Sequence, residues 1–463
     1  MKSIFILIFL VFFVSIIKLY SQIEETNAFT LNEAKNYALE HNILIKNSKL
    51  NIVLSEKKVW EAIAQGLPQA DLTVDYTDFF DYEIEFGFGG STSEPPVLDY
   101  DLLDAGDLEV LKLLEGLMEP SGSSVIVMDN SSSAKFQISQ LIFNGQYFIG
   151  IKTAKIAKKI TEQSLFKTQK DVKELVTTAY YLVLITDESL KILDNNLSNL
   201  EKSITHSEAL LKAGMAEQFD IDQIKITLSM LKNTKNAMKR NLELNYNMLR
   251  FQLGIEHDKT FALTDSLKNI IEKADAETLL LSVFNYENNI NYQILSSQEQ
   301  LSKKMIDMQT MSYLPTIGAF YSYNEKLLTT DFDMNPKNVA GLNLSWKLFT
   351  SNIRNVKRQQ AQIDMEITKN NKYQLKEQLL LQEKQYRYNL RNNIDNYKLQ
   401  KENLQLSDNI YENIKRKYSQ GILSSLDLTQ ANDNYLKAQN TYLSSVMEVL
   451  QAKLALDKLL NKL

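Results

Sequence analysis

Cysteine is absent from the 463-residue sequence, and histidine occurs only three times. The lack of cysteine excludes disulfides, thiolate metal sites, a cysteine nucleophile and lipid attachment through an N-terminal cysteine. The histidines His41, His206 and His257 lie far apart in the chain, so no histidine-based metal or acid–base centre is expected. We therefore expect no metal, no cofactor and no enzymatic activity.

Basic stretches are lacking as well. The net charge is −6, and charged residues make up 23% of the chain. Proteins that bind nucleic acids carry clustered lysine and arginine on one face or helix. The sequence shows no such cluster, and we expect no nucleic-acid partner.

The N-terminus carries a long apolar stretch. Lys2 precedes a mostly apolar run that ends near Ile17, and the small residue Ser21 follows shortly afterwards. This is the pattern of a secretory signal peptide, residues 1–21, cut after Ser21. A retained single membrane helix is the alternative, because bulky residues precede the cut. Both interpretations place the remainder of the chain outside the cytoplasm.

Proline occurs at only six positions, and the stretches 121–314 and 337–463 contain none, so both allow long helices. Gly214 and Gly421 each interrupt a long polar tract in which apolar residues recur three and four positions apart. The predicted elements are a long helix over 146–213, a turn at 214 and a return helix over 215–253, then a long helix over 352–420, a turn at 421 and a return helix over 422–461.

Two shorter helices, over 31–65 and 275–312, precede Pro68 and Pro315, where the hydrophobic period changes to two. Each long helix could therefore pack against two short helices stacked end to end. Strands in which apolar and polar residues alternate suit a sheet with lipid on one side and water on the other. A half-buried sheet of a soluble protein is the alternative. The four strands are predicted near 69–80, 133–143, 316–325 and 338–349.

The sequence repeats itself once. The order helix, Leu-Pro, strand, loop, strand, long helix, glycine turn and return helix occurs twice. Ile138–Gly145 aligns with Leu344–Ser351, and each glycine turn is followed six residues later by an aspartate. The first repeat spans 22–256 and the second 257–463.

The first repeat differs from the second in a long acidic segment, 81–131, between its two strands. This segment contains many aspartates and glutamates but only one cationic residue, Lys112, and glycine, serine and proline are frequent in it. We expect a solvated external loop. A calcium site is the alternative, although the spacing is not that of an EF-hand; its ligands would be Asp99, Asp101, Asp104 and Asp107.

The predicted fold is mainly α with a small β part, built from duplicated long-helix hairpins and four transmembrane strands. Four strands cannot close a membrane barrel, so the chain must assemble. Three copies would supply twelve strands and leave room for a lumen. Their helices could continue the barrel as a tube whose far end is marked by Gly214 and Gly421, because glycine accepts the positive φ of a reversing chain.

From Thr30 to Leu460 this duplicated order resembles the TolC-like outer membrane efflux proteins of Gram-negative bacteria. The resemblance implies a homotrimer with a 12-stranded barrel in the outer membrane and a helical tube in the periplasm. It also implies contact with outer membrane lipid, a periplasmic adaptor protein and an inner-membrane pump. The function implied is that of a passive efflux or type I secretion duct, which such partners open. The alternative is an exported coiled-coil protein that bridges envelope layers without conducting.

The tip motif of that family carries the resemblance at residue level. The second copy keeps the glycine, aspartate and alanine of the motif, whereas the first has Ile224 at the alanine position. The resemblance implies that the tip turns contact the adaptor, through Gly214, Gly421 and Ala431.

Two further roles follow from the same resemblance. Asp427 would belong to a ring of carboxylates that narrows the closed pore, with Gln430 in the next ring, whereas a simple helix cap with Ser424 is the alternative for Asp427. A hydrogen bond between Tyr418 and Asp220 would latch the closed tip.

Overall fold

The computed structural model describes residues 27–80, 82–86, 103–117, 124–127, 130–214, 216–328 and 336–463. The expected signal peptide and its cut lie outside these ranges. The chain forms two compact units. The helical unit is Met1–Glu61, Ile149–Gln309 and Asn355–Leu463, and the sheet unit is Ala62–Phe148 and Thr310–Arg354. Among the described helices, none has an apolar stretch long enough to cross a membrane.

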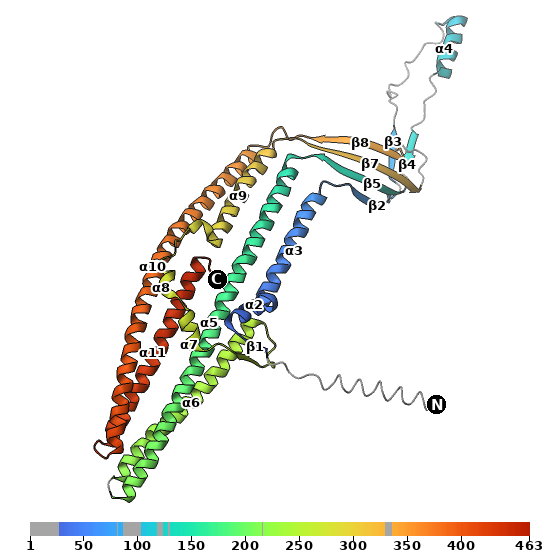
Figure 1. Cartoon of the computed structure of the whole chain (residues 1–463). Coiled ribbons are helices and arrows are strands. Elements are labelled where there is room, and N and C mark those ends of the chain that lie inside the picture. Colours follow the sequence, from blue (N-terminus) through green and yellow to red (C-terminus); the bar gives the residue numbers. More distant parts are fainter. Residues whose placement is uncertain are drawn as a thin grey trace, which may run out of the picture. The chain divides into compact units, whose positions relative to one another are not determined.

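Two antiparallel hairpins of long helices dominate the helical unit (Figure 1). The first consists of α5 (Gly145–Lys212) and α6 (Gln218–Leu253), and the second of α10 (Ile353–Ser419) and α11 (Ser425–Leu459). At 1.5 Å per residue, α5 is roughly 100 Å long. Ion pairs along the first hairpin fix its register: Glu208 with Lys225, Glu201 with Lys232 and Asp194 with Lys235.

The tract expected as one helix over 31–65 is broken at Asn42, into α2 (Leu31–His41) and α3 (Ile43–Ala64). The Asn42 side chain accepts a hydrogen bond from Leu44 N at 2.8 Å and donates one to Gln252 O at 2.7 Å. Thr30 opens α2 with the expected capping box. The break therefore serves a contact with a distant part of the chain.

The tract expected as one helix over 275–312 is also divided. Asn285 and Asn289 each accept a backbone N–H through their side chains, and such caps compete with a continuous helix. Nearby, the short strands β1 (Asn27–Phe29) and β6 (Phe261–Leu263) pair in parallel. The helical pieces are α7 (Leu267–Lys273), α8 (Ala276–Leu279), the 3-10 turn η2 (Tyr286–Asn288) and α9 (Ile290–Met311).

The sheet unit contains one antiparallel four-stranded sheet in the order β2-β5-β7-β8. Leu72 of β2 lies opposite Phe136 of β5, and Phe136 lies opposite Tyr323 of β7. Within the part of the chain that the structure describes, both outer strands, β2 and β8, have one unpaired edge. The strands are β2 (Gln69–Thr77), β5 (Ser131–Phe143), β7 (Thr316–Leu328) and β8 (Asn338–Ser345).

The acidic segment expected as a loop contains regular structure. Strands β3 (Glu83–Phe86) and β4 (Ser124–Val127) pair as an antiparallel hairpin, and α4 (Ala105–Leu117) lies between them in sequence. Asp104 caps α4, because its Oδ1 accepts hydrogen bonds from the amides of Gly106 and Asp107 at 2.8 and 2.9 Å. Asp99 and Asp101 lie outside the described residues.

Candidate functional site

Both glycine turns reverse the chain with a left-handed residue, and both lie at the same end of the helical unit (Figure 1). Gly214 and Gly421 each have φ of 73°. After α10, Gly421 N donates to Tyr418 O at 2.9 Å and Ile422 N to Lys417 O at 3.0 Å, which is a Schellman ending. A side chain at either glycine would meet no atom within 4 Å. The backbone angle, not crowding, therefore selects glycine.

Each return helix begins with a capping box that uses the aspartate of the tip motif. Asp427 Oδ2 accepts hydrogen bonds from the Ser424 hydroxyl at 2.7 Å and from its amide at 3.0 Å. These two bonds, the hydroxyl first, hold the pKa of the Asp427 carboxyl below its usual value. In the first hairpin Asp220 Oδ2 accepts from Glu217 N at 3.2 Å. Asp427 is thus an exposed, ionised cap.

Among the described residues, three hydrogen bonds join the tip of one hairpin to the tip of the other, and we call them the tip ties. The Tyr418 hydroxyl bonds to Ser207 Oγ at 2.5 Å, and Ser425 Oγ donates to Asp220 Oδ1 at 2.5 Å. The third joins His206 Nε2 and Ser419 O at 3.0 Å. Tyr418 and Asp220 therefore both join the two hairpins, but each has a serine partner in place of the direct pair that the resemblance implied.

Ser207 and Ser425 were not predicted as site residues. Ser207 is fully buried and Ser425 is 1% exposed. Ser207 follows the apolar positions Leu200 and Ile204 of α5 at helical spacing. A polar residue on an apolar stripe was thus the available signal.

A compact apolar cluster lies behind the tip ties. Ala431 is 5% exposed and belongs to this cluster, as does Ile224, which holds the alanine position in the first hairpin. Tyr411 stacks on Tyr435 with ring centroids 5.3 Å apart. Burial, followed by the nearby Glu412 carboxylate, raises the pKa of Tyr411 to about 12. Ala431 therefore packs inside the tip.

The outer surface of the tips, unlike the cluster behind the tip ties, exposes both polar and large apolar side chains. Gln430 is exposed and its side-chain amide donates to Asn434 Oδ1 at 3.3 Å. Phe219, Ile422 and Leu426 are also exposed, at 71%, 65% and 59%. The roles of Asp427 and Gln430 in a pore constriction concern several copies of the chain, and they stay predictions.

Tight packing surrounds the two Leu-Pro transitions of the sheet unit. Pro68 lies between α3 and β2, where a side chain on Gly66 would overlap the Tyr147 ring. The Tyr147 hydroxyl donates to Ile63 O at 3.0 Å. Pro315 lies between α9 and β7, and Arg354 contacts this segment with its guanidinium 4.8 Å from the centre of the Tyr313 ring.

The sheet has one apolar and one polar face. Residues that pair across the strands share a face, so register assigns each side chain. Leu72, Leu342 and Leu344 are 70%, 78% and 63% exposed. The mainly polar face carries Asp71, Thr73, Lys135, Gln137, Ser322 and Asn343, with the apolar residues Leu141, Phe320 and Val339 among them. The mainly apolar face carries Leu72, Val74, Tyr76, Phe136, Ile138, Ile317, Tyr321, Tyr323, Leu342 and Leu344, with the polar residues Gln140, Glu325 and Asn338 among them.

Among the residues that the structure describes, no three His, Cys, Asp or Glu side chains are placed to hold a metal ion. Asp104 and Asp107 are the described members of the alternative calcium cluster, and they bond to each other's backbone amides at the start of α4.

Residues 287–462 match the sequence profile of the family described as outer membrane efflux protein. The resemblance to the TolC-like outer membrane efflux proteins is confirmed. The match covers most of the second repeat, including α10, α11 and the turn at Gly421. No curated protein sequence matches the chain.

Solved structures share the fold over nearly the whole chain. The outer membrane protein VceC of Vibrio cholerae is 12% identical, with a TM-score of 0.67 over 93% of this chain and 95% of that one. The CmeC outer membrane channel of Campylobacter jejuni is 14% identical, with a TM-score of 0.67 over 95% and 90%. The open MtrE outer membrane channel of Neisseria gonorrhoeae is 13% identical, with 0.66 over 95% and 93%. The predicted fold class, mainly helical with a small sheet, is confirmed.

Proposed function

We propose that the chain forms the outer membrane channel of a tripartite efflux or type I secretion system. The observation that carries this proposal is the sheet, whose four strands present one mainly apolar face and one mainly polar face. Such a sheet separates lipid from water. A coiled-coil protein that only bridges envelope layers has no use for it. The protein then lies in the outer membrane of a Gram-negative bacterium and extends into the periplasm.

The unpaired edges of β2 and β8 support assembly as a homotrimer. Backbone N–H and C=O groups must be paired in lipid, so a membrane sheet closes into a barrel without edges. Three copies supply twelve strands when β8 of one chain pairs with β2 of the next. Twelve strands leave a lumen, whereas eight would be filled by side chains. The duct is passive, and a periplasmic adaptor and an inner-membrane pump choose the cargo and supply the energy.

The gate of the duct lies at the hairpin tips. The tip ties hold one hairpin against the other in the closed state, and their loss would let the hairpins separate. The exposed, ionised Asp427 and the neutral Gln430 line the constriction and favour cations over anions. The adaptor contacts the exposed apolar side chains beside Gly214 and Gly421, namely Phe219, Ile422 and Leu426. Ala431 supports this surface from inside.

Single-channel conductance in a planar lipid bilayer tests the proposal. Wild type should give small, cation-selective currents, and Ser425→Ala should raise them because it removes a tip tie. Ser445→Ala is the matched control: this serine is also 1% exposed, but its hydroxyl bonds only to Tyr442 O of its own helix. Asp427→Asn should lower cation selectivity. If no variant conducts although each is folded and inserted, the duct proposal fails and the bridging coiled coil replaces it.

A further inference from the structure

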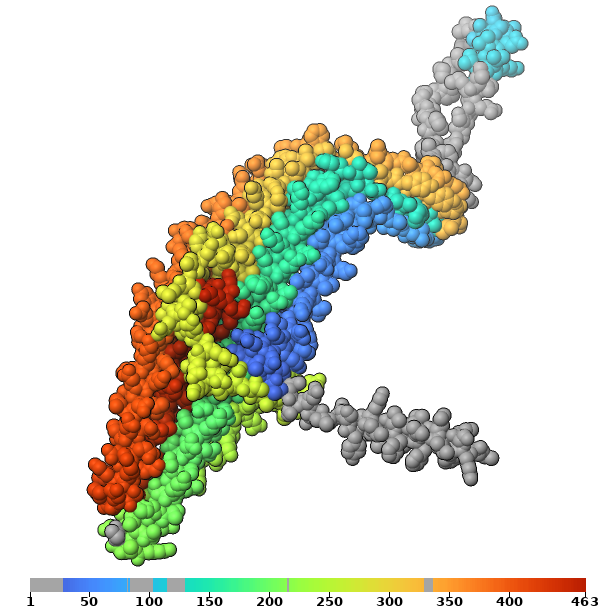
Figure 2. Space-filling model, in the orientation of Figure 1, coloured from blue at the N-terminus to red at the C-terminus, as the bar shows by residue number. Residues whose placement is uncertain are grey.

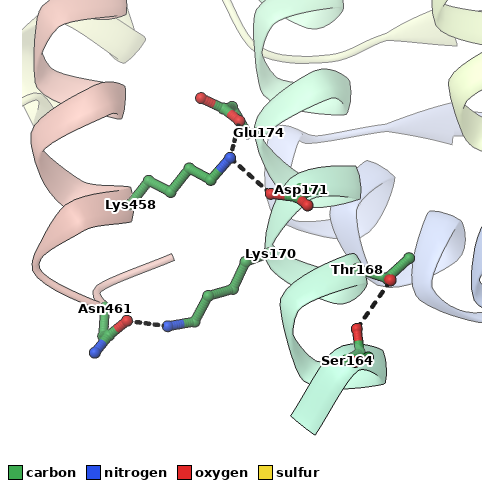
Figure 3. A network of polar contacts seen from close by, with 7 residues as sticks. All are labelled: Ser164, Thr168, Lys170, Asp171, Glu174, Lys458 and Asn461. Carbon is green, nitrogen blue, oxygen red and sulfur yellow. Dashed lines mark hydrogen bonds and ion pairs between the residues drawn. The ribbon is translucent and has the colours of Figure 1, made fainter. Parts of the chain in front are cut away.

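The helical unit contains a buried lysine without a counter-ion among the described residues. This lysine lies many residues before the tip turn at Gly214. Lys170 of α5 is only 3% exposed. Its ammonium donates to Asn461 Oδ1, a neutral acceptor (Figure 3). The ammonium also lies 4.6 Å from the centre of the Phe166 ring. Among the described residues, no carboxylate pairs with it. Burial, and then the nearby charges of Lys173 and Lys458, lower the pKa of Lys170.

The carboxylates nearest to Lys170 in sequence form ion pairs with another lysine. Lys458 of α11 bonds to Asp171 at 2.7 Å and to Glu174 at 2.5 Å (Figure 3). Burial lowers the pKa of Lys458, but these two hydrogen bonds outweigh it and leave the pKa raised. The two lysines thus differ sharply, because one has two anionic partners and the other has none.

Asn461 explains how Lys170 is held in place. Asn461 follows α11 with φ of 62°, in the left-handed region. Its side chain contacts Lys170 and also donates to Asn288 O at 2.5 Å. In Figure 2 the end of α11, in red, lies among the residues around α7 to α9, in yellow. This cluster fastens the end of α11, yet a neutral residue at position 170 could fill that role without the cost of burying a charge.

A cavity of about 550 Å³ adjoins Lys170. Elements α5, α9, α10 and α11 all contribute to its wall. Lys167, Lys170 and Lys458 line it together with Asp171 and Glu174, so its charged lining has one more cation than anions. The wall also contains apolar side chains and neutral hydrogen-bond donors, among them Asn291, Gln382 and Tyr386. The volume suits a small organic molecule.

We propose that this cavity binds a small molecule with an oxyanion group, a carboxylate or a phosphate, which serves as the counter-ion of Lys170. Lys170 and Lys167 bind the oxyanion oxygens, and the amides of Asn291 and Gln382 orient the remainder. Lys458 neutralises one of the two negative charges of Asp171 and Glu174, and the charges of Lys167 and Lys170 outweigh the other, so the lining still attracts an anion. The site is independent of conduction, so it stands or falls separately from the proposed duct.

Isothermal titration calorimetry of the purified full chain, with citrate and with inorganic phosphate against sodium chloride of equal ionic strength, tests this proposal. We expect saturable binding of one or both oxyanions by wild type, at one site per chain. Saturation by phosphate alone assigns a phosphate ligand, and saturation by citrate alone assigns a carboxylate ligand. If neither oxyanion saturates, the proposal is overturned whatever the variants show.

Two lysine variants locate the site. Lys170→Gln keeps a donor for Asn461 but removes the charge, and it should weaken binding at least tenfold. Lys268→Gln, at an exposed lysine outside the cavity, should bind as wild type does. Equal affinity in wild type and Lys170→Gln would show that Lys170 only fastens Asn461. Thermal unfolding of Lys170→Gln without added oxyanion checks that the variant is folded.

Discussion

The hydrogen bond between Tyr418 and Ser207 should respond unequally to the removal of its two partners. Ser207 Oγ already donates its only proton to Ser203 O at 2.7 Å. The Tyr418 hydroxyl must therefore donate to Ser207, which accepts. Tyr418 is 7% exposed and Ser207 is fully buried. Removal of the serine thus leaves a buried donor without a partner, whereas removal of the tyrosine hydroxyl leaves Ser207 bonded to its own helix.

The magnitudes follow from this asymmetry. Tyr418→Phe removes one hydrogen bond between neutral groups and should cost about 0.5–1.5 kcal/mol of stability at the tip. Ser207→Ala adds the cost of an unpaired buried hydroxyl and should reach about 1–3 kcal/mol. The double variant removes both partners, so it should cost less than the two single changes together. In the proposed duct, each 1.4 kcal/mol shifts the ratio of open to closed tips about tenfold.

Hydrogen–deuterium exchange at the tip measures these costs locally. Amides around Gly214 and Gly421 should exchange fastest in Ser207→Ala, more slowly in Tyr418→Phe and slowest in wild type. In the double variant, the loss of tip stability measured by exchange should be smaller than the sum of the losses in the two single variants. Equal effects of the two single changes, or strict additivity in the double variant, would refute the assigned direction of the hydrogen bond.

Three further predictions concern the backbone, pH and the sheet. Gly421→Ala should lower the free energy of unfolding by about 1–2 kcal/mol because φ is 73° there. Gly150→Ala, in the second turn of α5, where an added Cβ meets no atom within 4 Å, should raise it by about 0.5–1 kcal/mol. Unfolding temperatures that shift in the same direction in both variants would contradict this. The pKa of Tyr411, about 12 when folded, exceeds the ordinary value of about 10. Its contribution to stability should therefore be constant below about pH 10 and be lost as pH rises to about 12, and Tyr411→Phe should remove that part of an alkaline unfolding profile. Leu342→Asp should abolish trimers in detergent, as judged by light scattering, because it places a charge on the apolar face, while Asn343→Asp on the polar face should not.

The long helices and strands could be predicted because their signals are local. Proline-free tracts with a three-to-four period allow only helix over such lengths, and the two glycine turns need no knowledge of the rest of the chain. The break at Asn42 could not be predicted in this way. Its side chain bonds to Gln252 O, which lies 210 residues away, and no local pattern reports such a contact.

The candidate site shows the same division. The turns at Gly214 and Gly421 and the Ser424–Asp427 cap follow from sequence motifs. The partners of Tyr418 and Asp220 depend instead on which turn of one hairpin faces the other, and a helix slide of one turn would change them. The only signal for Ser207 in the sequence was a polar residue on an apolar stripe. Contacts between helices that are distant in sequence could therefore not be predicted.

The open edges of β2 and β8 have a consequence for how the protein matures. A lone chain in lipid would leave the outward backbone groups of both edge strands unpaired, and each such group costs several kcal/mol. In the proposed trimer, a single subunit therefore has no stable inserted state. Insertion and oligomerisation become one concentration-dependent event, and its yield should vary with roughly the third power of the subunit supply. When a cell makes less of this chain, the amount of assembled trimer should therefore fall more steeply than the rate of synthesis of the chain.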